Sequence, residues 1–368
     1  MKRPLPPLSI PIFRRNLLTL FVLIYASCLY PLEGSGKDSR SKIFQTLYSL
    51  PSSPTQSAKD RNWDACASSF EMVEKSKWNH LRSYSISKFG KPNHNAHDVI
   101  TSRGRAIPVE AKFTFGFFDK DIEEEPVALF LADSQCKWSL KARGTTNSDG
   151  RFSANLEPLP VGIYPARAVL EPSGTMAKFQ ITVLNPGEPV AVFDIDGTLT
   201  LSDGELIYQI LRKVFRGEYI PKMRTSAVEV VQLIRAKGYH LVYLTGRPYP
   251  LHRMTRSWLA NHKFPRGTLI LTDSNRESYP AKVGVGTFKA QRIQGLTESE
   301  LEPVMGFGNA KTDIYAYEEA ALPKELTFII GKHGGKNSTV KIQRYDKSMS
   351  EFEKIPDTTE NQAFNPNY

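Results

Sequence analysis

The chain has 368 residues, enough for two domains and a tail, and it carries a formal net charge of +10 at pH 7. Such a charge favours an anionic partner, and lipid headgroups, a membrane surface and nucleic acid all qualify. Because lysine and arginine are scattered and no nucleic-acid motif is present, we expect no nucleic-acid partner.

The amino-terminal residues have the layout of an export signal. An uncharged stretch, LLTLFVLIYASCLYPL, follows the basic residues Lys2, Arg3, Arg14 and Arg15. This pattern predicts a signal peptide or membrane anchor over residues 1–36 and therefore an exported protein, whether periplasmic, secreted or membrane-tethered. Cys28 lies where a bacterial lipoprotein would be acylated, and the sequence leaves that alternative open.

Residues 37–100 predict a linker followed by a poorly defined segment, because serine, proline, glycine and charged residues dominate its first part. The histidine-rich NHNAH near its end has no acidic or thiol partner nearby, so we favour an ordinary polar loop over a metal site. Besides Cys28 the chain has only Cys66 and Cys136. These two could form a disulfide or remain free thiols.

Residues 101–186 predict an all-β domain. Short alternating runs such as PVALFLAD, GIYPARAVL and AKFQITVL are separated by turns rich in glycine, proline, asparagine and aspartate. Strands at this spacing are typical of an immunoglobulin-like sandwich. No catalytic pattern occurs in it, so we expect it to pack against or orient the next domain.

Residues 187–333 predict an α/β domain with a parallel sheet. Apolar runs such as VAVFDID, HLVYLTG, TLILTD and VMGFG alternate with helical patterns. In such sheets the functional crevice lies at the carboxyl ends of the strands. After residue 334 the chain becomes polar, and we expect a mobile tail over 334–368.

Residues 190–200 read VAVFDIDGTLT, an apolar run followed by two aspartates. Side chains two positions apart in a strand face the same side, so Asp194 and Asp196 should share one crevice. There Asp194 can attack phosphorus as the nucleophile while Asp196 exchanges a proton with the leaving group. Gly197 permits a sharp turn beside the phosphate, and Thr198 can add a hydroxyl contact to it. An ordinary aspartate-rich turn is the alternative.

Further candidates follow later in the chain. Thr245 and Gly246 end the HLVYLTG run and could bind phosphate oxygens, and Lys289 could hold the phosphate beside the nucleophile. In VMGFGNAKTD, Asp313 opens a predicted helix and supplies a further acidic group. Carboxylate and amide oxygens suit magnesium. The expected Mg²⁺ ligands are Asp194, Asp196, Asp313 and Asn309.

This order of motifs resembles the haloacid dehalogenase superfamily of phosphohydrolases that form an aspartyl-phosphate intermediate. Residues from about 189 to 333 resemble the LNS2 region shared by lipins and the RdgB/Nir-type phosphatidylinositol transfer proteins. The resemblance depends on FDIDGTLTLSD, YLTGRP, SWLANHKFPRGTLILTD and GFGNAKTDIYAYEEAALP. Upstream, SDGRFSANLEPLPVGIYPARAVL resembles the β-rich segment that precedes LNS2 in the RdgB/Nir type.

The two branches of this resemblance imply different functions. Similarity to lipins implies Mg²⁺-dependent hydrolysis of phosphatidic acid to diacylglycerol and phosphate. Similarity to the RdgB/Nir type implies binding of phosphatidic acid without cleavage. Lipins carry Ser-Ala-Arg where this chain has Thr245, Gly246 and Arg247, a conservative difference.

Because both aspartates of the first motif are present, we predict a phosphatidate phosphatase with a HAD-like fold. Its partners would be phosphatidic acid or another anionic phospholipid and the membrane surface. A non-catalytic phosphatidic-acid sensor, an exported acid phosphatase of broad specificity, and an interaction protein acting through its β-rich part are the alternatives. A predicted helix over 205–216 carries an apolar stripe beside basic residues, which could pack on its own domain or lie in a membrane interface. The sequence leaves the oligomeric state open.

Overall fold

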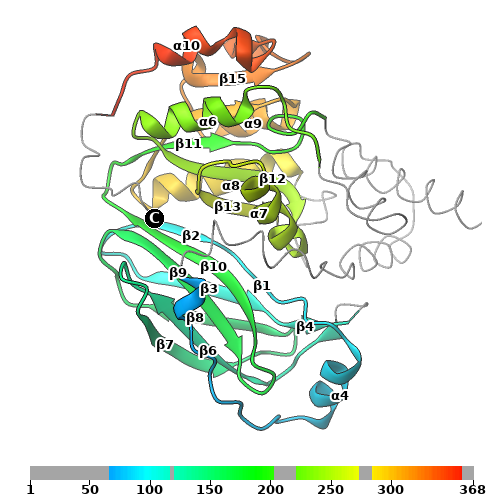
Figure 1. The fold of residues 1–368 in the computed structure, drawn as a ribbon. Helices are drawn as coiled ribbons and strands as arrows, with labels where there is room; N and C mark the ends of the chain where they lie inside the picture. The colour runs from blue at the N-terminus through cyan, green and yellow to red at the C-terminus, as the bar shows by residue number, and fades with distance from the viewer. Residues whose placement is uncertain (1–65, 117–119, 203–220, 273–283, 359–368) are drawn as a thin grey trace, which may run out of the picture.

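The computed structural model of the chain describes residues 66–116, 120–202, 221–272 and 284–358. Within them a β-sandwich is followed by an α/β domain, and the two domains stack on each other (Figure 1). The predicted signal segment 1–36 and the whole predicted helix over 205–216 lie outside these residues. No helix in the described ranges is long and apolar enough to cross a membrane.

Two antiparallel-rich sheets form the sandwich, as the sequence predicts. The larger sheet is five-stranded, in the order β2 (Val99–Ser102), β10 (Thr175–Leu184), β9 (Gly162–Leu170), β6 (Pro126–Ala132) and β7 (Trp138–Thr145). The smaller sheet contains β1 (Asn95–Ala96), β3 (Ile107–Lys112) and β8 (Arg151–Leu156), and a hairpin of β4 (Thr114–Phe115) and β5 (Lys120–Asp121) adjoins it.

Alternation of side chains explains how the two sheets pack. Val127, Leu129 and Leu131 of β6 point into a common core with Val109 of β3, and all four are buried. The sequence pattern does not reveal strand β7. Most of its side chains are exposed at the edge of the sheet, so its sequence lacks the alternation of a half-buried strand.

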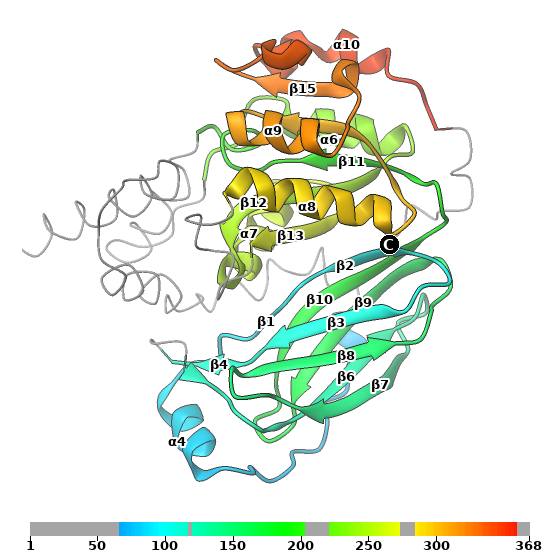
Figure 2. The same cartoon turned by 180° about the vertical axis from the view of Figure 1, so that it is seen from behind.

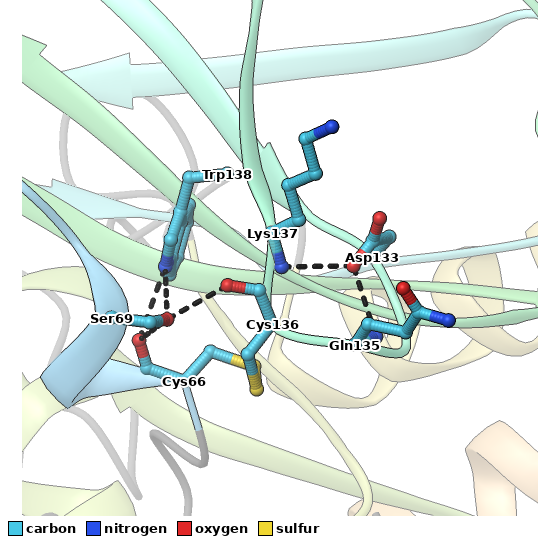
Figure 3. The surroundings of a disulfide bond; sticks show 7 residues. All are labelled: Cys66, Ser69, Asp133, Gln135, Cys136, Lys137 and Trp138. Carbon is cyan, nitrogen blue, oxygen red and sulfur yellow. Dashed lines mark hydrogen bonds between the residues drawn. A yellow bond between two sulfur atoms is a disulfide. The ribbon is translucent and has the colours of Figure 1, made fainter.

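A disulfide joins Cys66 to Cys136 across 70 positions of sequence and fastens the first described segment to the turn between β6 and β7 (Figure 3). Ser69 Oγ donates to the carbonyl of Cys136 at 2.8 Å, and Trp138 Nε1 donates to the carbonyl of Cys66 at 3.1 Å. Of the two alternatives that the sequence left open, the structure has the bonded pair.

The segment predicted as linker and polar loop contains ordered structure at its end. It holds α4 (Leu81–Phe89), which follows the short turn η2 (Ala67–Ser69), and the strand β1. His94 packs against the ring of Phe113, with 5.0 Å between the ring centroids. The NHNAH histidines are therefore packing residues, and the apolar partners that enclose them come from distant parts of the chain.

The α/β domain contains a six-stranded parallel sheet. Its order is β13 (Thr268–Thr272), β12 (His240–Pro248), β11 (Pro189–Phe193), β14 (Glu302–Gly308), β15 (Thr327–Ile330) and β16 (Val340–Ile342). Chain order therefore reverses direction between β11 and β14. A doubly wound sheet has its functional crevice at such a point, at the carboxyl ends of the strands.

Helices cover both faces of this sheet (Figures 1 and 2). One face packs against α6 (Ala227–Ala236), α7 (His252–Asn261) and α10 (Met349–Glu353), while the other packs against α8 (Val285–Glu298) and α9 (Lys311–Glu319). Short helical turns complete the domain: η3 (Tyr249–Leu251), η4 (Lys324–Leu326), η5 (Lys336–Ser338) and η6 (Tyr345–Lys347).

The carboxyl-terminal segment differs from the mobile tail expected over 334–368. Strand β16 extends the sheet, and Phe352 of α10 is fully buried against Phe307 and Phe328. Only a few large apolar residues make these contacts, so the mostly polar composition of the segment did not predict that it packs on the domain. Residues 359–368 lie outside the described part of the chain.

A buried carboxylate joins the two domains. Asp98, whose side chain is fully buried, accepts hydrogen bonds from the backbone N–H of Gln180 in the sandwich and of Leu269 in β13, at 2.9 and 3.0 Å. The Arg256 guanidinium of α7 pairs with the same carboxylate, and His252 Nε2 lies 3.2 Å from Arg256 Nη2. One side chain thus holds elements of both domains together.

We expect acid to weaken this junction through His252. Burial lowers the pKa of His252 well below 6.5, and the nearby Arg256 charge lowers it further. Below pH 6.5 the unfolded chain therefore binds a proton that the folded protein does not, so stability is full above pH 6.5 and falls as the pH drops. The slope is at most about 1.4 kcal/mol per pH unit.

Denaturant unfolding of wild type and His252→Gln between pH 7.5 and 5 measures this contribution. Glutamine keeps an acceptor for Arg256 and does not titrate. The wild type should lose more stability on acidification than the variant, and parallel curves would contradict the assignment.

Candidate functional site

The candidate residues come together at the carboxyl ends of the central strands. Asp194 directly follows β11, Thr245 lies in β12, Lys289 lies on α8 and Asp313 lies in the first turn of α9. Because β12 and β14 flank β11 in the sheet, the sequence-distant motifs meet at the point where the chain order reverses. The structure therefore brings the predicted aspartates, threonine and lysine together in one cluster.

Lys289 joins two of the three aspartates. Its ammonium lies 2.6 Å from Asp194 Oδ1 and 2.6 Å from Asp313 Oδ1, and all three side chains are buried. The other oxygen of Asp313 accepts the backbone N–H groups of Asn309 and Ala310, both at 2.9 Å. Lys289 thus neutralises carboxylates instead of facing open space for a phosphate.

The close approach of these groups has a backbone requirement and an electrostatic consequence. A Cβ on Gly308 would lie 2.5 Å from the Cβ of Asp313, so only glycine fits there.

Burial raises the pKa of Asp194 to about 7, with the charge of Asp313 adding to the rise and Lys289 opposing it. Burial by itself would lower the pKa of Lys289, but the two carboxylates outweigh it and raise that pKa.

Asp196 is held by a second cation, Arg247. The guanidinium binds the carboxylate with two hydrogen bonds, Nε to Oδ2 at 2.9 Å and Nη2 to Oδ1 at 2.8 Å, and its own side chain is fully buried. Thr245 Oγ1 also donates to Asp196 Oδ2, at 3.2 Å, and Arg247 Nη1 donates to Thr255 Oγ1 at 3.2 Å. Both oxygens of the predicted acid/base therefore already have protein donors.

The remaining predicted residues shape this network. Thr198 Oγ1 donates to Asp194 Oδ2 at 2.8 Å and lies 3.2 Å from Asn309 Oδ1. Gly197 has a φ of +74°, a conformation that favours glycine at this turn. A Cβ on Gly246 would lie 2.9 Å from Cγ1 of Val285, so Gly246 permits α8 to approach β12.

Two arginines at this site are absent from the residues predicted from the sequence. Arg247 lies two positions after Thr245 in β12, and that spacing places both side chains on one side of the strand. Arg224 donates from Nε to the carbonyl of Gly197 at 2.8 Å. Among the interactions of the described residues, the Arg224 Nη atoms have no protein acceptor.

The carboxylate oxygens expected to bind magnesium are engaged with cations and donors of the protein. Each carboxylate oxygen of Asp194, Asp196 and Asp313 already accepts a hydrogen bond from the protein. No group of three or more histidine, cysteine, aspartate or glutamate side chains in the described ranges is arranged to hold a metal. Magnesium binding stays a prediction from the sequence.

Family comparison agrees with this two-domain architecture. A family model described as PITM 1-3, LNS2 domain, matches residues 191–331, and another described as PITM 1-3, beta-sandwich domain, matches residues 92–183. The chain belongs to the PITM 1-3 family. Its α/β domain is therefore an LNS2 domain of the HAD-like fold, preceded by the family's β-sandwich, and the resemblance and fold class inferred from the sequence are confirmed.

Individual relatives of this family are similar over most of the chain. Human membrane-associated phosphatidylinositol transfer protein 1 is 30% identical over 263 residues, which are 70% of this chain and 20% of the relative. Protein retinal degeneration B of Drosophila melanogaster is 28% identical over 76% of this chain and 22% of its own length. Mouse membrane-associated phosphatidylinositol transfer protein 3 is 29% identical over 75% and 27%. The chain spans about a fifth to a quarter of these relatives.

These relatives correct the predicted activity and the predicted location. Two of them are named as phosphatidylinositol transfer proteins, so the predicted phosphatidate phosphatase is wrong, as are the broader acid-phosphatase alternative and the hydrolase class. The pairing of Asp196 with Arg247 gives a physical reason, because a proton-exchanging residue needs an oxygen open to the substrate. The predicted export is also wrong, since the relatives are named as membrane-associated transfer proteins.

We expect the Asp196–Arg247 pair to be a major contributor to stability of the LNS2 domain. Arg247→Leu leaves a mostly buried carboxylate without its cation, which should lower the free energy of unfolding by about 3–5 kcal/mol. Replacing both residues by leucine removes the uncompensated charge and should be less destabilising than Arg247→Leu alone. Denaturant unfolding of the wild type and the two variants tests this, and a loss below about 1 kcal/mol for Arg247→Leu would refute it.

Proposed function

We propose that the LNS2 domain of this chain binds the phosphate of an anionic phospholipid at a membrane surface and does not hydrolyse it. The observation that carries the proposal is the two-point pairing of Asp196 with the buried Arg247. A hydrolase of this design needs that carboxylate to exchange protons with the leaving group. The names of two relatives, which specify phosphatidylinositol transfer, support a phospholipid partner.

Arg224 is the group that we propose for recognition of the lipid phosphate. It is half-buried beside the Gly197 turn and uses its Nε there, so its Nη atoms remain for an anion. Arginine binds phosphate oxygens with paired, charge-assisted hydrogen bonds. The neighbouring carboxylates oppose an anion least when their charge is neutralised, which Lys289 and Arg247 achieve.

Phosphatidic acid is the proposed lipid. Its terminal phosphate is a monoester, which offers more unsubstituted oxygens and more negative charge to a guanidinium than a phosphodiester does. We further propose that binding needs no magnesium, because the carboxylate oxygens are already engaged.

Vesicle binding by the full chain tests this function. Wild type should bind phosphatidylcholine vesicles containing phosphatidic acid, with or without a chelator, and should release no inorganic phosphate from them. Arg224→Gln should weaken binding by about tenfold, the value of one lost charge-assisted contact. The matched control is Arg103→Gln, the same charge change at an exposed position after β2, and it should leave binding close to wild type.

Three results would overturn the proposal. Phosphate release that is lost in Asp194→Asn would show an enzyme. Equal binding of vesicles with and without phosphatidic acid would remove the lipid assignment. Equal effects of the two arginine variants would show that only net charge matters.

A further inference from the structure

Helix α4 presents apolar side chains to solvent. Phe89 is 94% exposed, Leu81 79% and Tyr84 40%, while the deeply buried residue of this helix is Ser83, at 3%. At 100° per residue, Leu81, Tyr84, Lys88 and Phe89 lie on one face and Ser83 lies opposite. A helix that serves only its own domain has the reverse arrangement, with apolar residues inward.

This exposure is concentrated in one stretch of the chain. Across the described residues the large hydrophobic side chains that are exposed are Met72, Leu81, Tyr84, Phe89, Leu140, Val161, Leu201 and Tyr315. Half of them lie within residues 72–89. Single exposed apolar side chains are ordinary, whereas a gathered set marks an interaction surface.

Positive charge predominates in the sequence around the apolar face. Residues 71–91 contain Lys75, Lys77, Lys88 and Lys91 besides the paired Arg82, against the carboxylates Glu71 and Glu74. Lys88 lies on the exposed face itself, with its ammonium 5.1 Å from the centroid of the Tyr84 ring. The nearby Glu123 and Glu124 are already paired with Arg82 and His80. The partner of this surface should therefore be both apolar and anionic.

The ends of α4 are fixed to the sandwich, so the exposed face has a set direction. Before its first turn, the backbone N–H groups of Asn79 and His80 donate to the buried carboxylate of Glu125 at 2.9 and 3.0 Å. After its last turn, a Cβ on Gly90 would lie 2.5 Å from the backbone nitrogen of Gly116, so these two segments of the backbone pack closely together. Ordering this surface on binding therefore costs little conformational entropy.

The exposed helix also lies on the same side of the molecule as the candidate site. In both views α4 projects toward the side on which α7 begins, and α7 follows the carboxyl end of β12 (Figures 1 and 2).

We propose that the face of α4 formed by Leu81, Tyr84, Lys88 and Phe89 inserts into the interfacial layer of an anionic phospholipid bilayer. Leu81 and Phe89 enter the boundary between headgroups and acyl chains, and the surrounding lysines contact the lipid phosphates. This surface supplies membrane affinity without choosing a headgroup. It is separate from the headgroup recognition proposed for Arg224 and does not depend on it.

Sedimentation of the full chain with phosphatidylcholine–phosphatidylserine vesicles, free of phosphatidic acid, tests the proposal. The double variant Leu81→Ser, Phe89→Ser should reduce the partition coefficient by about tenfold or more. Because both side chains are largely exposed, the thermal unfolding curve should stay unchanged. The matched control Leu140→Ser alters a 44% exposed leucine on β7, and it should partition like wild type.

Insertion itself is measured with Phe89→Trp. Its fluorescence should be quenched by vesicles carrying bromine on the upper acyl chain, whereas that of Leu140→Trp should not. Unchanged partition of the double variant or absence of quenching would overturn the proposal. Concentration-dependent self-association that the double variant abolishes, without any effect on vesicle binding, would also overturn it and would show that a second copy covers this face.

Failure of the α4 insertion proposal can be distinguished from failure of the proposed headgroup recognition. Loss of discrimination between phosphatidic acid and phosphatidylserine in Arg224→Gln tests headgroup recognition alone. Loss of binding to vesicles without phosphatidic acid in the α4 variant tests membrane insertion alone.

Discussion

The cost of burying an unpaired carboxylate is the constraint on which this structure depends. Asp194 and Asp313 share the ammonium of Lys289, Asp196 is held by the guanidinium of Arg247, and Asp98 at the domain junction is paired with Arg256. Removing any of these cations would leave negative charge in a medium that solvates it poorly. The positions of α7, α8 and α9 against the sheet are fixed by the same pairs, because the partners come from different elements.

Pairing of this kind also changes the chemistry that a motif resembling that of a phosphohydrolase can perform. The sequence keeps both aspartates of a phosphohydrolase, yet the pocket surrounds them with donors from the protein itself. A carboxylate satisfied in this way stabilises a fold well and exchanges protons poorly. Two of the relatives are named as phosphatidylinositol transfer proteins, and paired carboxylates of this kind agree with the binding without hydrolysis proposed above.

Helix α7 connects the site to the β-sandwich. Adjacent residues of this helix face in the two directions, since Thr255 accepts a hydrogen bond from Arg247 and Arg256 pairs with Asp98. Backbone N–H groups from both domains bind Asp98 as well. The sandwich therefore supports the element that holds the Asp196–Arg247 pair, and this gives the β-rich domain a positioning role.

The fold class, the order of the two domains and the gathering of Asp194, Thr245, Lys289 and Asp313 could be predicted from the sequence, because alternating apolar runs and strand-end positions are local patterns. The partner of each charge could not. No local pattern shows that Arg247 binds Asp196, that α10 completes the sheet's core, or that α4 directs Phe89 outward, because each depends on contacts between distant segments. The prediction of catalysis was wrong for that reason, since reactivity depends on which atoms surround a carboxylate and the motif specifies only that the carboxylate is present.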